Sequence, residues 1–249
     1  MPRFFKEFFE EEPFISGDDA RHISKSLRMK VGEKLTVCDT KGVDYNCTIT
    51  GFSGDSVLLN INEKIPNATE PGVFVTLYQC LCKGDKMDTI VKQSVEMGVS
   101  KIVPVISTNC VSRPDDKALK KKIERWQKIA NEAAGQSGRG ILPEVAYAIS
   151  FNETVKSAAS DNICYFFYEL GTEPMKKIDD GVKTISVIIG PEGGFTQKEA
   201  EAIVNAGAVC ATLGPRILRA ETAPVAAMAN IMLLSGNMVK ANLANSIFS

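Results

Sequence analysis

The chain has 249 residues, 44% of them hydrophobic, which is enough for one large domain or two smaller ones with well-formed cores. The formal net charge of -1 gives no overall attraction to nucleic acid or to an anionic membrane, so either partner would need a local basic patch. Seven scattered cysteines, without a Cys-x-x-Cys pair or a Cys/His cluster, argue against a disulfide framework and against a metal site. They fit a cytoplasmic protein with reduced thiols.

Residues up to about 67 have the pattern of a small β-rich unit. Strand-forming runs at 34–39, 45–52 and 57–61 are separated by turns at Gly42 and Gly54, and residues 18–29 have a helical pattern. Two prolines and Gly72 in the polar stretch 65–72 indicate a linker. We therefore expect a first domain at 1–70 and a second at 71–249.

From Val73 onward, strand and helix patterns alternate. Strands are expected at 73–81, 101–106, 163–169, 184–189 and 209–213, and helices at 85–97, 115–134, 197–206 and 223–234. Such alternation predicts an α/β fold with a mostly parallel sheet covered on both faces. Ligands of such sheets bind beyond the carboxyl ends of the strands.

Two glycine-proline motifs fall at that edge. They read Ile-Gly-Pro-Glu-Gly-Gly-Phe-Thr at 189–196 and Leu-Gly-Pro-Arg-Ile-Leu-Arg-Ala-Glu-Thr-Ala at 213–223. Neither matches the dinucleotide-binding or the P-loop pattern. Glycines allow backbone N–H and C=O groups to approach a ligand closely, and the prolines stiffen the loops. The motifs thus indicate a small-molecule pocket, with two ordinary tight turns as the alternative.

These motifs, together with residues 126–139 (Trp-Gln-Lys-Ile-Ala-Asn-Glu-Ala-Ala-Gly-Gln-Ser-Gly-Arg) and the opening Met-Pro-Arg-Phe-Phe, resemble the RsmE family. Its members are S-adenosylmethionine-dependent methyltransferases of the SPOUT class that modify N3 of a uridine in 16S ribosomal RNA. The resemblance covers nearly the whole chain. It implies a PUA-like RNA-binding N-terminal domain, a trefoil-knotted C-terminal sheet and a homodimer. The apolar helix at 223–234 is either part of the dimer interface or simply core.

The resemblance places S-adenosylmethionine in a pocket made by the two motifs and the end of the preceding strand. Backbone groups and apolar side chains would hold the adenine. The cofactor-binding residues that it implies are Leu170, Ile189, Gly190, Pro191, Glu192, Gly193, Gly194, Leu213, Gly214, Arg216, Ile217, Leu218 and Ala223.

Catalysis at uridine N3 requires loss of the N3 proton, so the site needs a base or a cation that stabilises the uridine anion. We expect Arg219 to stabilise O2 or O4 of the anion. We expect Glu221 to accept the proton or to hold Arg219 in position. An Arg-x-Glu at the start of a helix can instead be a capping and pairing arrangement.

Local basic residues are expected to hold the 16S rRNA through phosphate contacts, which position RNA without reading its sequence. The target base would enter the pocket unpaired. His22, the only histidine, could equally be packed beside Ile23 and Leu27, and Arg139 could be an ordinary surface arginine. A second basic run, from Lys117 to Arg125, could be a solvated helix face. The residues expected to contact RNA are Arg3, Arg21, His22, Lys25, Arg28, Lys83, Lys86 and Arg139.

The sequence departs from the family pattern at two places. Gln93 stands where the family usually has a lysine, with Lys92 one position earlier, and Ala220 replaces a threonine. One position turns a helical side chain by roughly a third of a rotation, so Lys92 is not assumed to substitute. These changes concern substrate contacts more than the cofactor loops. Another SPOUT methyltransferase, acting on a ribose 2′-hydroxyl or on tRNA, and a non-catalytic RNA-binding ribosome-assembly factor stay open as alternatives.

Overall fold

The computed structural model of the protein describes residues 1–7, 9 and 13–238. The chain forms two compact units, Met1–Glu70 with Ala134–Leu142, and Pro71–Ala133 with the chain from Pro143 onward. The end of the second predicted domain, residues 239–249, lies outside the described part. No helix within that part is long and apolar enough to cross a membrane.

The first unit is built on a five-stranded sheet with the order β1-β3-β4-β5-β2. β1 pairs with β3 in parallel, and the other pairings are antiparallel. The strands predicted at 34–39, 45–52 and 57–61 are confirmed. The sequence missed β1 and β2, which have three residues each and too little length for a visible alternation. The strands are β1 (Arg3–Phe5), β2 (Phe14–Ser16), β3 (Lys34–Cys38), β4 (Val43–Ser53) and β5 (Ser56–Pro66).

The helix predicted at 18–29 is shorter than expected. It consists of α1 (Gly17–Arg21) followed by the π-helical turn η1 (His22–Ser26). Arg28 has a φ of +53°, which is left-handed backbone that no helix continues through. Ile23 of this segment is fully buried and joins Leu35, Val37 and Ile49 in the core of the unit.

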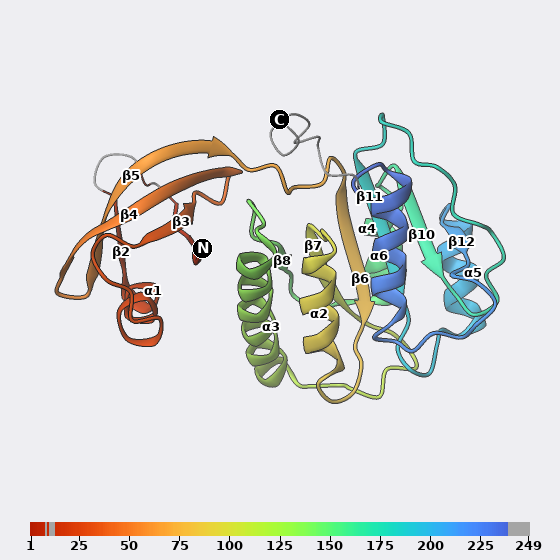
Figure 1. The fold of residues 1–249 in the computed structure, drawn as a ribbon. Coiled ribbons are helices and arrows are strands. Elements are labelled where there is room, and N and C mark those ends of the chain that lie inside the picture. Colours follow the sequence, from red (N-terminus) through yellow and green to blue (C-terminus); the bar gives the residue numbers. More distant parts are fainter. Residues whose placement is uncertain (8, 10–12, 239–249) are drawn as a thin grey trace. The chain divides into compact units, whose positions relative to one another are not determined.

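The second unit contains a seven-stranded sheet in which every pairing is parallel, so the predicted α/β fold is confirmed (Figure 1). The strand order is β12-β10-β11-β6-β7-β8, and β9 also pairs with β7. β10, β11 and β12 are neighbours whose carboxyl ends meet at one edge. The strands are β6 (Phe74–Cys80), β7 (Lys101–Ile106), β8 (Glu144–Val145), β9 (Ile149–Ser150), β10 (Ile163–Phe167), β11 (Thr184–Ile189) and β12 (Val209–Ala211).

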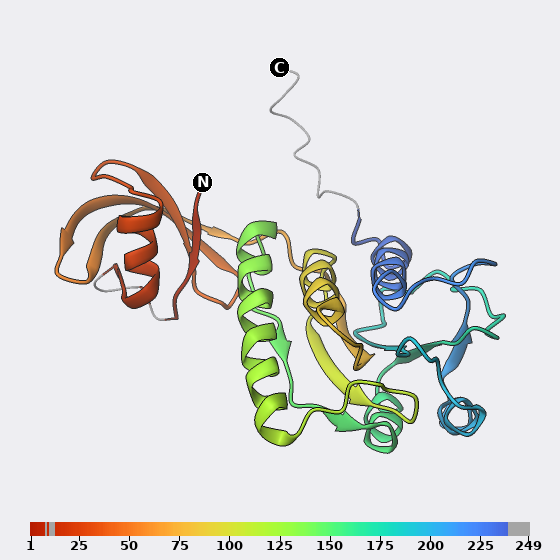
Figure 2. The same ribbon diagram turned by 90° about the horizontal axis from the view of Figure 1, so that it is seen from below.

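Helices cover both faces of this sheet, as predicted. The helices are α2 (Lys86–Glu96), α3 (Asp116–Ser137), α4 (Phe151–Ala158), α5 (Gln197–Asn205) and α6 (Ala223–Leu234). In Figure 2, α2 and α6 lie on one face of the sheet, and α4 and α5 lie on the other. α6 buries Met228 and Ile231 against the sheet side, whereas Leu233 is 63% exposed. α4, which the sequence did not predict, begins with a capping box between Ser150 and Glu153.

Candidate active site

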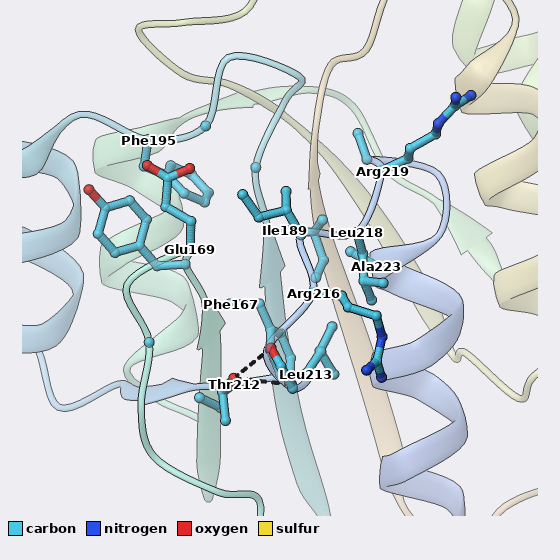
Figure 3. A pocket seen from close by; sticks show the side chains of 18 of the residues that line it. Phe167, Glu169, Ile189, Phe195, Thr212, Leu213, Arg216, Leu218, Arg219 and Ala223 are labelled. Carbon is cyan, nitrogen blue, oxygen red and sulfur yellow. Dashed lines mark hydrogen bonds between the residues drawn. The ribbon is translucent and has the colours of Figure 1, made fainter.

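A cavity of about 840 Å³ lies at the carboxyl ends of β10, β11 and β12 (Figure 3). Its wall combines residues that follow each of these strands with Lys86 at the start of α2. Both glycine-proline motifs therefore border the same cavity, although residues 197–212 separate them in the chain. The parallel strand order brings them together.

Most of the residues expected to bind the cofactor line this cavity. Leu170 does not, and its side chain is 72% exposed. Gly193 packs against Asn109 instead. The cavity is also lined by Phe167, Phe195 and Thr212, which were not among the expected cofactor-binding residues. The expected residues in the lining are Ile189, Gly190, Pro191, Glu192, Gly194, Leu213, Gly214, Arg216, Ile217, Leu218 and Ala223.

Three glycines of the motifs have physical reasons to be glycine. A Cβ on Gly190 would lie 2.9 Å from a ring carbon of Phe195, too close for any side chain. Gly194 and Gly214 have φ angles of +65° and +99°, which favour glycine. The loops can therefore bring backbone against a ligand while keeping the cavity open.

Lys86 joins the two motifs electrostatically. Its Nζ lies 3.0 Å from Oε1 of Glu192 in the first motif and 3.4 Å from Oε2 of Glu221 in the second. The hydrogen bond to Glu192 is the main cause of the raised pKa of Lys86, which therefore stays a cation. Burial raises the pKa of Glu192, but hydrogen bonds from its own backbone, Lys86 and Lys83 outweigh burial and lower it. One ammonium is thus paired with an acidic side chain from each motif.

The two expected catalytic residues have different positions. Arg219 lines the cavity, and in Figure 3 its guanidinium extends away from the other labelled side chains. Glu221 is absent from the lining and pairs with Lys86. α6 begins without a side-chain hydrogen bond from its N-cap residue, Thr222. Glu221 has an ion-pair partner in Lys86.

Hydrogen bonds of Asn109 and Glu199, two residues that the sequence did not indicate, hold the first motif in place. Asn109 Nδ2 donates hydrogen bonds to the carbonyl oxygens of Gly193 and Gly194, at 3.1 and 3.3 Å. The buried carboxylate of Glu199 accepts from the backbone and hydroxyl of Thr108 at 2.8 and 2.9 Å. Its other oxygen accepts two bonds from Thr196, which begins α5 with a capping box. Only the folded chain brings Asn109 and Glu199 to the same loop.

Buried thiols lie near the carboxyl ends of β6 and β7. A hydrogen bond with Cys80 is the main cause that lowers the pKa of Cys110 to about 6, whereas burial raises the pKa of Cys82 to about 12. In the part of the chain that the structure describes, no group of three or more His, Cys, Asp or Glu residues is arranged to hold a metal ion.

Two of the residues expected to contact RNA form ion pairs inside the first unit. The Arg3 guanidinium donates to both carboxylate oxygens of Asp44, at 2.9 and 2.5 Å. Arg139 is 3% exposed and donates to both oxygens of Glu70, at 2.9 and 2.8 Å. Neither guanidinium is presented to a phosphate.

The other residues expected at the RNA surface have varied positions. Arg21, His22, Lys25 and Arg28 are exposed on the first unit, and Lys83 is exposed on the second. Lys86 belongs instead to the cavity wall. Of the two positions that depart from the family pattern on α2, Lys92 is exposed and Gln93 is half-buried, and the cavity lining includes neither.

Comparison with known proteins defines the class first. An RNA methyltransferase domain matches residues 69–232, and an RNA methyltransferase PUA domain matches residues 15–62. The fold and the cavity are thus those of an RNA methyltransferase with a preceding PUA domain. The ribosomal RNA small subunit methyltransferase E of Bacillus subtilis (strain 168) is 33% identical over 246 residues, covering 93% of this chain and 96% of that protein. The chain belongs to the ribosomal RNA small subunit methyltransferase E family, RsmE.

Solved structures agree with this membership. The crystal structure of the Neisseria gonorrhoeae ribosomal RNA small subunit methyltransferase E, bound to S-adenosyl methionine, matches with a TM-score of 0.85 at 32% identity. The match covers 94% of this chain and 98% of that one. A putative methyltransferase from Legionella pneumophila, in complex with the cofactor SAM, matches with a TM-score of 0.86 at 25% identity over 94% of this chain and 97% of that one.

Proposed function

We propose that the protein methylates N3 of a uridine in the 16S rRNA of the small ribosomal subunit, with S-adenosylmethionine as methyl donor. The observation that carries the proposal is the cavity that both glycine-proline motifs form together in a chain of this family. The names of the relatives support a small-subunit rRNA substrate, and the bound cofactor of the Neisseria structure supports the donor.

The residues of the cavity fit this cofactor. Leu213, Leu218 and Ile189 offer apolar surface for the adenine, and the glycines leave backbone groups exposed beside them. Glu169 and Glu192 place carboxylates on the wall, which suits a ligand with a cationic sulfur. When bound, S-adenosylmethionine supplies an electrophilic methyl group on a sulfonium.

The remaining chemistry falls to charged side chains near the cavity. Arg219, on its wall, is the candidate for stabilising the negative charge that develops on uracil oxygens as N3 loses its proton. Glu221 is the candidate base, held by Lys86.

We propose that the two domains of the chain have separate roles in RNA binding and in methyl transfer. Residues 1–70, completed by 134–142, would form a PUA-like RNA-binding domain that holds rRNA phosphates through Arg21, Lys25 and Arg28. The rest of 71–249 would form the SPOUT methyltransferase domain, with its chain knotted. We further propose a cytoplasmic homodimer, to which the exposed Leu233 of α6 would contribute apolar surface.

The decisive experiment is methyl transfer from labelled S-adenosylmethionine to small subunits that lack the modification, followed by nucleoside mass spectrometry. N3-methyluridine in 16S rRNA is the expected product. A 2′-O-methylated nucleoside, or a product on tRNA alone, would replace the proposal with another SPOUT activity. Cofactor binding without a product on any RNA would favour a non-catalytic assembly factor.

A further inference from the structure

Lys86 occupies a position where helix electrostatics disfavour a cation. It is the first residue of α2, and the N-terminus of a helix carries partial positive charge. Asp88 in the same turn is the favourable choice there. The interaction of the Lys86 ammonium with the helix dipole is therefore unfavourable. Stabilising α2 does not explain why a lysine is at this position.

The partners of the ammonium identify that task. Glu192 and Glu221 come from the two motifs that wall the cavity, and both carboxylates lie within ion-pair distance of the same Nζ. Two carboxylates gathered at one point repel each other unless a cation lies between them. The backbone N–H of Lys83 donates to Glu192 at 3.2 Å, so the loop before α2 is bound to the first motif as well.

Building on the proposed function, we propose that Lys86 is a positioning residue for methyl transfer: its ammonium holds the two glycine-proline motifs together at the cavity and keeps Glu221 in place. This role differs from the phosphate contact that the sequence suggested for Lys86. The phosphate role needs a free ammonium facing RNA, whereas this role needs the two carboxylates.

Hydrogen exchange in the cofactor-free protein tests the role directly. Lys86→Met should speed amide exchange in peptides covering 189–196 and 213–222, because the two carboxylates then repel across the gap. Lys86→Arg should behave like the wild type, since a guanidinium can serve both carboxylates. Adding Glu192→Gln to Lys86→Met should restore slow exchange, because one of the repelling charges is gone. Lys92→Met, an exposed lysine on the same helix, is the matched control.

Cofactor affinity and turnover give the second readout. We expect Lys86→Met to weaken S-adenosylmethionine binding roughly tenfold, because the two motifs that wall the cavity are no longer held together, and Lys86→Arg to bind the cofactor like the wild type. Turnover should fall with Lys86→Met while the KM for RNA stays unchanged, because the side chain does not bind RNA.

The opposite results would overturn the proposal. If Lys86→Met leaves exchange and cofactor affinity unchanged but weakens RNA binding and lowers the salt slope by about one, Lys86 is a phosphate contact. If the wild type binds no S-adenosylmethionine or makes no N3-methyluridine, the proposed function fails, yet the exchange experiment still decides whether Lys86 joins the motifs.

Discussion

At the scale of single residues, two charged side chains that are close in the sequence have different surroundings in the structure. Arg219 and Glu221 are two positions apart, but the arginine is on the cavity wall and the glutamate is bound to Lys86. Neighbouring residues of one short motif can therefore have different roles. The chemistry of each must be tested separately.

Replacing Arg219 tests charge stabilisation in the transition state. Arg219→Ala should lower kcat by roughly a hundredfold to a thousandfold if the guanidinium turns toward the bound uracil, because a donor to the developing negative charge is then lost. Single-turnover kinetics at saturating cofactor would measure the change, and Arg219→Lys should retain part of the rate. Lys198→Ala, an exposed charge on α5, is the control. Full turnover in Arg219→Ala would remove the arginine from the mechanism.

Exposed cations of the first unit should contribute to RNA binding, whereas those of the second basic run should not. Arg21→Ala and Lys25→Ala should each lower the slope of log affinity against log salt by about one, because each removes a phosphate contact. Binding isotherms over a salt series measure the slope. Lys120→Ala, in the second basic run, should leave it unchanged. Equal slopes for all variants would contradict an RNA surface at Arg21 and Lys25.

At the scale of elements, the start of α5 depends on one buried carboxylate. Glu199→Gln should destabilise the protein by about 1–3 kcal/mol at pH 7, because the glutamine amide would turn N–H groups toward donors of Thr108 or Thr196. Urea denaturation measures the difference. Glu201→Gln, exposed on the same helix, should change little.

The difference in unfolding free energy between the wild type and Glu199→Gln should depend on pH. Burial raises the pKa of Glu199, but hydrogen bonds from Thr108 and Thr196 outweigh it and lower the pKa below its ordinary 4.5. The folded carboxylate thus binds protons less readily than the unfolded one, so its stabilisation is present above pH 4.5 and is lost as pH falls through the lowered native value. The gap between wild type and Glu199→Gln should shrink from pH 7 toward pH 3. A constant gap would show that the carboxylate charge is not involved.

Elements were predictable from the sequence where their periodicity was long enough. The helical pattern at 223–234 and the apolar run at 184–189 give the bounds of α6 and β11. β8 and β9 have two residues each, which is too short for a sequence pattern, and they become strands only by pairing with β7 in the folded protein. The site divides in the same way: the glycine motifs are visible in the sequence, but Asn109 acquires its role only through folding.

At the scale of the whole molecule, the first unit is assembled from two separate stretches of chain. Glu70 accepts from the Arg139 guanidinium and from the backbone N–H groups of Gly140 and Ile141, at 2.7 and 3.1 Å for the last two. Asn67 and Arg3 donate to the carbonyl oxygens of Gly138 and Arg139. Residues 134–142 therefore complete the polar interior of a unit that the linker at 65–72 seemed to end.

An isolated fragment 1–70 should consequently fail to form a cooperative fold. Half-buried Glu70 would lose the Arg139 guanidinium, and Arg3 would keep Asp44 but lose the Arg139 carbonyl oxygen, at a cost approaching that of breaking a buried ion pair, about 3–5 kcal/mol. The same fragment joined through a flexible linker to residues 134–142 should unfold cooperatively in urea, monitored by near-ultraviolet circular dichroism. Arg139→Met in the joined fragment should abolish that gain. A cooperative transition of fragment 1–70 with an unchanged midpoint would refute the dependence.

Because the first unit combines two separate stretches of chain, it cannot be completed until the second stretch has been synthesised. A ribosome that has made Glu70 must still add the residues up to Leu142 before the second stretch of this unit has been synthesised. At ordinary elongation rates this takes roughly 4 to 14 s. During that interval the nascent N-terminal segment carries an acidic residue without its partner. The N-terminal unit thus reaches its final form after much of the methyltransferase sequence has begun to emerge.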